Sequence, residues 1–220
     1  MAAIIFDLDG TLVDSVPDIH AAVTLMLADH QASPMDMSQV RSFIGNGVPA
    51  LISKVMEARD EDPADAKRHA QLEATFMRHY TAAPAKLSQL FPGVRKALLK
   101  LQGAGHAMAL CTNKPIIPAR AMLASFELEN LLPLVIGGDS LPVRKPDPAP
   151  LHAAARAMGA DPVLYIGDSE VDAEAAERAA IPLMLFTQGY RKSPIAALTH
   201  SATFDHFDEL PRLISRFADG

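Results

Sequence analysis

The sequence predicts an α/β fold, a doubly wound parallel sheet of Rossmann-like type with a small all-helical unit inserted after the first strand. Short apolar runs alternate with amphipathic segments of ~10–15 residues over the C-terminal part of the chain, which is typical of βαβ units. The segment 15–80 instead has helical periodicity and contains no convincing strand. Several polar residues come directly after apolar runs, at the strand ends where open α/β sheets bind their ligands.

The composition limits which kinds of protein this chain can be. The chain has 220 residues, of which 49% are hydrophobic and 21% charged, as expected for one domain with an insertion or for two small domains. Its net charge of −6 argues against a nucleic-acid or anionic-membrane surface, although a metal and local cations can still bind a phosphorylated ligand. The single cysteine, Cys111, excludes an intrachain disulfide and is expected in the core. No signal peptide or membrane span is visible, so a soluble cytoplasmic protein is expected. The sequence leaves open whether it is a monomer or a homodimer.

The first strand is expected at 2–6, an apolar run that stops at two carboxylates separated by one residue. Asp7 and Asp9 would lie at the carboxyl end of this strand, and Gly10 permits the turn that follows. Two acids this close repel each other unless a cation or a shared proton compensates. The stretch therefore predicts a metal site, a proton-transfer pair, or both.

The inserted unit is expected to be helical throughout. Ser15 is expected to cap its first helix, which Pro17 helps to start. Apolar spacing predicts further helices at 38–43, 49–58 and 64–80. We expect the helical cap domain at 15–83 and the α/β core domain at 1–14 together with 84–220.

The core is expected to alternate strands and helices. A helix is expected to open after Gly93 and to close at Gly103. Further strands are expected at 107–112, 134–136, 163–166 and 183–186, and further helices at 118–126, 148–158, 172–179 and 207–216. Because crossovers in parallel sheets are right-handed, the strand ends that bear Asp7, Thr112 and Asp168 should meet at one edge.

Four short motifs follow one another at these strand ends. They are Asp7-Leu8-Asp9-Gly10-Thr11, Leu110-Cys111-Thr112-Asn113, Lys145 within Arg144-Lys145-Pro146-Asp147-Pro148, and Gly167-Asp168-Ser169-Glu170-Val171-Asp172. In this order they strongly resemble the motifs of the haloacid dehalogenase-like superfamily and span nearly the whole core. Any one of them alone would be a weak signal.

The resemblance implies a role for each acidic residue. Asp7 would be the nucleophile and form an aspartyl-phosphate, and Asp9 would protonate the leaving alkoxide and then activate water. An oxygen of Asp7, the backbone carbonyl of Asp9 and the carboxylate of Asp168 would hold Mg²⁺. Asp172 would orient Lys145 or a metal-bound water.

The resemblance also implies how the phosphate is bound. Thr112 and Lys145 would contact phosphate oxygens and stabilise negative charge in the transition state. Asn113, directly after Thr112, is expected to bind the substrate as well. The partner implied is thus a small phosphorylated metabolite.

Within the superfamily the sequence is most similar to bacterial phosphoglycolate phosphatases. The similar segments are 7–15, 17–19, 44–47, 112–115, 136–139, 145–148 and 189–190. The resemblance implies hydrolysis of 2-phosphoglycolate to glycolate and phosphate. The substrate carboxylate would meet backbone N–H groups of Gly45, Asn46 and Gly47, with Arg41 as a nearby cation. The sequence departs from the family's usual pattern at 180–182, away from the chemistry.

Three alternatives stay open. A phosphatase of another small phosphate ester, or a pyrophosphatase, would share every core motif. A β-phosphoglucomutase-like isomerase would use the same two aspartates, but its cap would supply a threonine and a lysine for proton relay, and no convincing pair is visible. A catalytically silent binding protein would have no need of the intact motif set.

Overall fold

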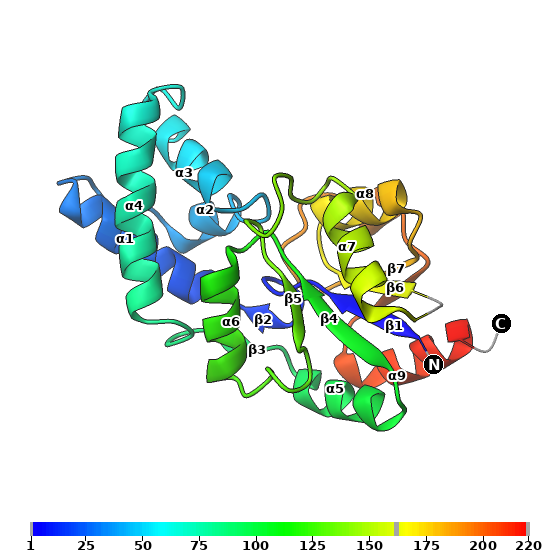
Figure 1. Cartoon of the computed structure of the whole chain (residues 1–220). Helices are drawn as coiled ribbons and strands as arrows, with labels where there is room; N and C mark the ends of the chain where they lie inside the picture. Colours follow the sequence, from blue (N-terminus) through cyan, green and yellow to red (C-terminus); the bar gives the residue numbers. More distant parts are fainter. Residues whose placement is uncertain (1, 161–162, 219–220) are drawn as a thin grey trace.

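The computed structural model describes residues 2–160 and 163–218 and contains a parallel sheet flanked by helices, with a cluster of helices beside it (Figure 1). The six-stranded sheet has the order β5-β4-β1-β6-β7-β8, and each neighbouring pair is parallel. Its strands are β1 (Ala3–Phe6), β4 (Ala107–Cys111), β5 (Leu134–Ile136), β6 (Val163–Gly167), β7 (Leu183–Phe186) and β8 (Ala202–Phe204). The predicted fold class is confirmed.

Strand β1 lies at the centre of the sheet, where the strand order reverses. Ile4 pairs with Met108 of β4 on one side and with Leu164 of β6 on the other. The carboxyl ends of these three strands therefore meet at one edge, as predicted, and this edge is the topological switch point where such sheets bind ligands.

Helices cover both faces of the sheet. α5 (Val94–Gly103), α6 (Ile116–Ser125) and α9 (Leu210–Ala218) pack on one apolar layer, and α7 (Ala149–Met158) and α8 (Glu170–Ala179) on the other. Two short 3₁₀ helices, η1 (Ile195–Ala197) and η2 (Phe207–Glu209), complete the C-terminal part. Because both faces are covered, β1 is buried on each side and reads as a continuous apolar run rather than an alternating one.

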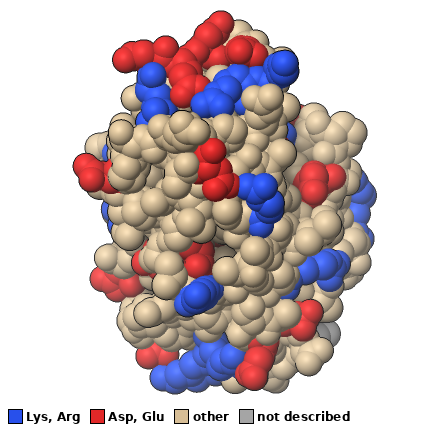
Figure 2. Space-filling model, turned by 90° about the vertical axis from the view of Figure 1, so that its left-hand side faces the viewer, with Lys and Arg blue, Asp and Glu red and all other residues tan. Residues whose placement is uncertain are grey.

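The second unit consists of α1 (Val16–Asp29), α2 (Met37–Arg41), α3 (Val48–Glu57) and α4 (Ala66–Ala82), and its apolar side chains form a core of their own. Phe76 and Tyr80 of α4 stack within it, with ring centroids 5.2 Å apart. On the side of the molecule that this unit forms, acidic and basic side chains are interspersed (Figure 2). Within the described ranges, each helix is too short or too polar to cross a bilayer.

Two short strands connect the units and were not predicted. β2 (Val13–Asp14) and β3 (Gln89–Leu90) form an antiparallel pair where the chain leaves the sheet and where it returns. Two-residue strands carry no periodicity, so the sequence offers no signal for them. The last strand, β8, was also missed, and α8 begins at Glu170 rather than at Asp172.

The start of α8 is fixed by a reciprocal cap. The Ser169 hydroxyl accepts a hydrogen bond from the Asp172 N–H (3.4 Å), and the Asp172 carboxylate accepts one from the Ser169 N–H (3.1 Å). This capping box satisfies two backbone donors of the first turn and starts the helix two residues earlier than the apolar spacing indicates.

The prediction that the Ser15 side chain caps α1 is wrong. Ser15 stands at the N-cap position, but its buried hydroxyl has no hydrogen-bond partner among the described residues. Instead the Tyr190 hydroxyl accepts hydrogen bonds from the backbone N–H groups of Ser15 (2.7 Å) and Val16 (3.3 Å). The group that caps the helix lies 175 positions away in the sequence. The residues around Ser15 give no sign of such a distant partner.

Candidate active site

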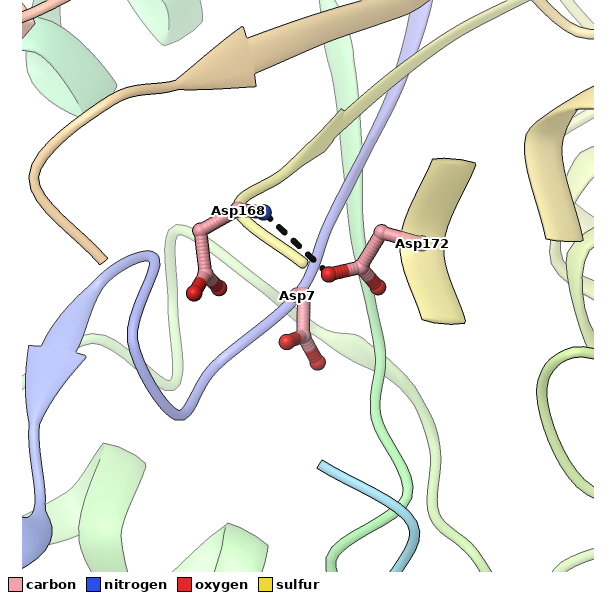
Figure 3. A group of neighbouring side chains, drawn as sticks. All are labelled: Asp7, Asp168 and Asp172. Carbon is pink, nitrogen blue, oxygen red and sulfur yellow. Dashed lines mark hydrogen bonds between the residues drawn. The ribbon is translucent and has the colours of Figure 1, made fainter. Parts of the chain in front are cut away.

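Three carboxylates converge at the edge of the sheet. Asp7 follows β1 and Asp168 follows β6, while Asp172 lies in the first turn of α8 (Figure 3). One oxygen from each carboxylate lies within 4.8 Å of the other two, and all three residues are buried. The backbone supports the arrangement, because Asp7 donates its N–H to the carbonyl of Ile166 on β6 (2.9 Å).

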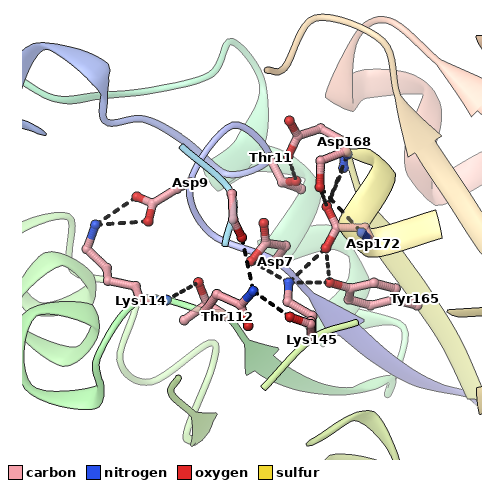
Figure 4. A network of polar contacts seen from close by, with 12 residues as sticks. Asp7, Asp9, Thr11, Thr112, Lys114, Lys145, Tyr165, Asp168 and Asp172 are labelled. Atoms are coloured by element: carbon pink, nitrogen blue, oxygen red, sulfur yellow. Dashed lines mark hydrogen bonds and ion pairs between the residues drawn. The ribbon is translucent and has the colours of Figure 1, made fainter. Parts of the chain in front are cut away.

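A buried lysine lies beside this group. The ammonium of Lys145 is 2.9 Å from Asp7 Oδ1, 2.7 Å from Asp172 Oδ1 and 2.7 Å from the Tyr165 hydroxyl (Figure 4). Lys145 is only 2% exposed. Burial opposes its charge, but the attraction of Asp172 and Asp7 outweighs burial and raises the lysine pKa above its usual value. The site therefore contains a fixed positive charge.

Asp172 has hydrogen-bond partners on both of its oxygens. Oδ1 accepts hydrogen bonds from Lys145 and from the Tyr165 hydroxyl, and Oδ2 accepts from the N–H groups of Asp168 and Ser169. Burial would raise its pKa, but Lys145 and these donors together lower the pKa of Asp172 below its usual value. Such a carboxylate is ionised, immobile and well suited to hold Lys145 in place.

The pKa values of Asp7 and Asp168 are raised, whereas that of Asp172 is lowered. Burial raises the pKa of Asp7 to about 6, against the lowering effect of Lys145. Burial and the neighbouring carboxylates of Asp172 and Asp7 raise the pKa of Asp168 well above its usual value. Two buried carboxylates whose charge is disfavoured gain most from a nearby cation.

The chemistry of the site fits a hard divalent ion. Asp7 Oδ1 is buried and accepts no hydrogen bond from the described residues, although it lies 2.9 Å from Lys145 Nζ. Asp168 is held in position by the Thr11 hydroxyl (2.7 Å) and the Tyr190 N–H (2.6 Å). Clustered carboxylate oxygens are the ligands that Mg²⁺ and Mn²⁺ prefer. The cluster can therefore hold a metal.

Asp9 takes part in a second ion pair, whose lysine is buried and whose carboxylate is partly exposed. Lys114 Nζ lies 2.8 Å from Asp9 Oδ1 and 3.0 Å from Oδ2, and it also donates to the Tyr80 hydroxyl. Lys114 is 5% exposed, and Asp9 and Tyr80 raise its pKa above the usual value despite its burial. We did not predict Lys114 as a site residue, although its place directly after Thr112-Asn113 at a strand end was an available signal.

A pocket lies between the two units. Its lining from the sheet side is polar, and its lining from the helical unit is mostly apolar. The residues that line it are Asp7, Asp9, Ile19, Ile44, Gly45, Gly47, Val48, Leu51, Phe76, Tyr80, Thr112, Asn113, Lys114 and Pro115. A concave site with a few convergent polar groups and an apolar wall suits a small ligand with one highly charged end.

The other predicted substrate-binding residues lie around this pocket. Asn113 donates from Nδ2 to the carbonyls of Gly45 (3.0 Å) and Lys145 (2.9 Å), so it ties the 44–47 loop to the sheet edge. The Thr112 hydroxyl accepts a hydrogen bond from the Lys114 N–H (3.3 Å). Gly47 has φ +82°, and a Cβ there would lie 3.0 Å from the Asn113 carbonyl, so a side chain would be strained.

Arg41 and Asn46 lie further from the pocket lining. The Arg41 guanidinium donates to the Gly189 carbonyl (2.9 Å) and lies over the Tyr190 ring, 5.0 Å from its centroid. Asn46 is exposed in the loop between α2 and α3. Their predicted contacts with substrate stay predictions.

The family model that describes haloacid dehalogenase-like hydrolases matches residues 4–186. The chain belongs to this family. The predicted resemblance is thus confirmed, and all four motifs of this haloacid dehalogenase-like hydrolase lie at one edge of its sheet.

Several relatives of this haloacid dehalogenase-like hydrolase are similar along nearly their whole length. It is 51% identical over 214 residues to a phosphoglycolate phosphatase of Cereibacter sphaeroides (strain ATCC 17025 / ATH 2.4.3), a match that covers 97% of this chain and 98% of the relative. It is 39% identical to a phosphoglycolate phosphatase of Rhodospirillum rubrum, with 94% and 88% covered. A crystal structure of a predicted phosphoglycolate phosphatase from Haemophilus somnus 129PT matches with a TM-score of 0.89 at 30% identity, covering 96% and 97% of the two chains.

Proposed function

We propose that the chain is a Mg²⁺-dependent phosphomonoester hydrolase that converts 2-phosphoglycolate to glycolate and phosphate through an aspartyl-phosphate. The observation that carries the proposal is the buried group of Asp7, Asp168 and Lys145 at the central strand ends, which offers a carboxylate nucleophile beside a fixed cation. The names of the relatives, which match along almost the whole chain, support the choice of substrate.

The proposal divides the chain into a hydrolase core and a cap. Residues 1–14 and 84–220 would form the core, and residues 15–83 the cap. The separate apolar core of α1 to α4 supports this division, as does the β2–β3 pair at the two chain crossings. A cap over the pocket would exclude bulk water during the reaction.

Asp7 would act as the nucleophile. Its carboxylate oxygen would attack the phosphorus, and the bond from phosphorus to the ester oxygen would break as the new bond forms. Asp9 would donate its proton to the leaving oxygen and so release glycolate. Asp9 would then take a proton from a water molecule that attacks the aspartyl-phosphate, which releases phosphate and restores the Asp7 carboxylate.

Lys145 and Thr112 would bind oxygens of the transferred phosphate. The ammonium of Lys145 is already held by Asp172 and Tyr165, so it needs little rearrangement when the charge develops. Asp172 would act through Lys145 as a positioning residue. Because burial disfavours charge on Asp7, the neighbouring lysine also helps to keep this nucleophile ionised.

The carboxylates of Asp7 and Asp168 and the backbone carbonyl of Asp9 would hold Mg²⁺. When bound, the ion would offset the negative charge of the phosphate and of both aspartates. The fit of these residues supports this assignment, since the buried carboxylates of Asp7 and Asp168 bring oxygens within 4.8 Å of each other and Asp168 is held in a fixed orientation by Thr11 and Tyr190.

The non-phosphate end of the substrate would lie toward the helical unit. The backbone of Gly45, Asn46 and Gly47 would approach it, with Asn113 holding the loop in place and Arg41 as a nearby cation. The hydrogen bond from Asn113 to the Gly45 carbonyl supports a fixed loop, because it joins the helical unit to the sheet edge.

Phosphate release tests the proposal. The panel comprises 2-phosphoglycolate, sugar phosphates, nucleotides and pyrophosphate, each with and without Mg²⁺, and Asp7→Asn serves as the background. We expect release from 2-phosphoglycolate well above this background and its loss with EDTA. Activity that survives Asp7→Asn or EDTA would contradict the mechanism, and a clear preference for another ester or for pyrophosphate would contradict the substrate.

A further inference from the structure

Lys114 has a position in the pocket that the proposed mechanism does not explain. Among the described residues that line the pocket, it is the one with a cationic side chain. Its ammonium lies against both oxygens of Asp9, at 2.8 and 3.0 Å. Asp9 must release at least one of these contacts before it can transfer a proton to a leaving oxygen.

An anionic substrate needs a cation in the same place. The wall of the pocket toward the helical unit is formed largely by Ile19, Ile44, Val48, Leu51 and Phe76. The carboxylate of 2-phosphoglycolate, its second anionic group, would be desolvated against these apolar side chains, and this would weaken binding unless the carboxylate met a positive charge. Of the lining residues that the structure describes, Lys114 offers that charge, whereas Arg41 lies outside the lining and donates to the Gly189 carbonyl.

We propose that the substrate carboxylate replaces the Asp9 carboxylate on Lys114, so that substrate binding itself frees Asp9 for proton transfer. The inference rests on the proposed function and assigns the selectivity for a carboxylate-bearing phosphate ester to Lys114. The exchange replaces one carboxylate by another, so the buried ammonium of Lys114 keeps an anionic partner throughout. Asp9, whose side chain is 15% exposed, is left to water and to the substrate.

Tyr80 keeps the ammonium in place during this exchange. Its hydroxyl accepts a hydrogen bond from Lys114, and the lysine Nζ lies 4.7 Å from the centroid of its ring. Burial raises the pKa of Tyr80 to about 12, so this partner stays neutral and does not compete as an anion. An ester without a second anionic group leaves Asp9 bound to Lys114 and is a poor substrate.

Two esters that differ in one terminal group test the inference. Ethyl phosphate has a methyl group where 2-phosphoglycolate has its carboxylate. For Lys114→Met we expect a rise in KM for 2-phosphoglycolate of about ten- to a hundredfold, from the lost charge-assisted hydrogen bonds. We expect kcat/KM for ethyl phosphate to rise, because Asp9 is no longer held, and an unchanged value would overturn the release of Asp9 by the substrate. Lys114→Arg should keep most of the preference, and Lys100→Met, at an exposed lysine of α5, should behave as wild type.

A second measurement uses the unaltered protein and does not depend on how the variant folds. Formate is a small carboxylate that could occupy Lys114 when ethyl phosphate occupies the phosphate site. We expect formate to raise kcat/KM for ethyl phosphate several-fold and to inhibit 2-phosphoglycolate hydrolysis, with chloride at equal ionic strength as the control. Equal inhibition of both reactions by formate would overturn the exchange.

The outcomes separate this inference from the proposed function. If wild type does not hydrolyse 2-phosphoglycolate above the Asp7→Asn background, the proposed function fails and the exchange fails with it. If wild type does so, but folded Lys114→Met loses activity equally on both esters or on neither, then the exchange alone is overturned. Thermal unfolding of each variant identifies losses that come from the fold.

Discussion

The two buried lysines of the site, Lys145 and Lys114, are held in different ways. Lys145 contacts Asp7, Asp172 and Tyr165, which all belong to the sheet and the helix that follows β6. Lys114 pairs with Asp9, which follows β1 (Figure 4). It also donates to Tyr80, which lies on α4 of the helical unit, and α4 is seen in Figure 1.

One pocket thus combines a charge held within a single unit with a charge shared between two units. A charge fixed within one packed unit is preorganised, because its partners do not move when the substrate arrives. A charge shared between two units depends on how these units are placed, and so it responds to a movement of the helical unit. Variants of each lysine and of its partners test this contrast.

The largest effect is expected for Lys145→Met. It leaves Asp172 buried without its cation, and breaking a buried pair in this way costs about 3–5 kcal/mol of the free energy of unfolding. It should also lower kcat at least ~100-fold, since the proposed phosphate contact is lost. Urea unfolding and phosphate release measure the two effects.

Lys114→Met is the matched comparison for stability. The side chain of Asp9 is 15% exposed whereas that of Asp172 is 1% exposed, so water can solvate Asp9 after its partner is removed. We expect a smaller loss of stability than for Lys145→Met. Equal losses in the two variants would show that the two lysines are held alike and would remove the contrast.

Asp7→Asn should stabilise the metal-free protein at neutral pH. The folded-state pKa of Asp7 is raised from 3.8 to about 6, so between these values the folded state binds more protons than the unfolded state. The contribution of Asp7 to stability is therefore present at low pH and is lost as the pH rises through about 6. From that shift, the gain of Asp7→Asn over wild type is on the order of 3 kcal/mol at pH 7.

This prediction is checked by urea unfolding in EDTA at several pH values from 4 to 7. The difference between Asp7→Asn and wild type should grow as the pH rises, and Mg²⁺ should reduce it by stabilising wild type alone. A difference that is constant with pH would contradict the raised pKa. Glu174→Gln, at an exposed side chain of α8, is the control for a generic change of charge.

The tyrosines beside the two lysines should separate stability from activity. The Tyr165 hydroxyl donates to Asp172 (2.5 Å) and accepts from Lys145, both within the sheet unit. Tyr165→Phe should cost about 1–3 kcal/mol, because it leaves hydrogen-bonding groups of a buried network unsatisfied. Tyr80→Phe should cost less stability but change KM for 2-phosphoglycolate, because it removes the hydrogen bond between Lys114 and the helical unit. A larger loss of stability for Tyr80→Phe than for Tyr165→Phe would show that Lys114, and not Lys145, is the more firmly held lysine.

The smallest effect is expected at the start of α1. Ser15→Ala should change stability by less than ~0.5 kcal/mol, because the Ser15 hydroxyl has no partner among the described residues. Tyr190→Phe should cost about 1–2 kcal/mol, since its hydroxyl caps the N–H groups of Ser15 and Val16. Thermal unfolding distinguishes the two. A larger loss for Ser15→Ala would show that the serine caps the helix after all.

The sequence alone determined the fold class and brought most of the candidate site together. Apolar runs that alternate with helical segments specify a parallel sheet, and the handedness of its crossovers places Asp7, Thr112 and Asp168 at one edge. These inferences succeed because they depend on local periodicity and on a rule that holds for nearly all such sheets. The boundaries of most helices were also correct within a few residues.

Tertiary structure alone decided the partners of the charged groups. The pairing of Lys114 with Tyr80, the cap that Tyr190 provides for α1, and the contact of Arg41 with Gly189 each join residues at least 34 positions apart. Neither periodicity nor turn chemistry encodes such contacts, because they depend on how the helical unit rests against the sheet. The sequence thus identified which residues could carry the chemistry, and packing determined which lysine each aspartate meets.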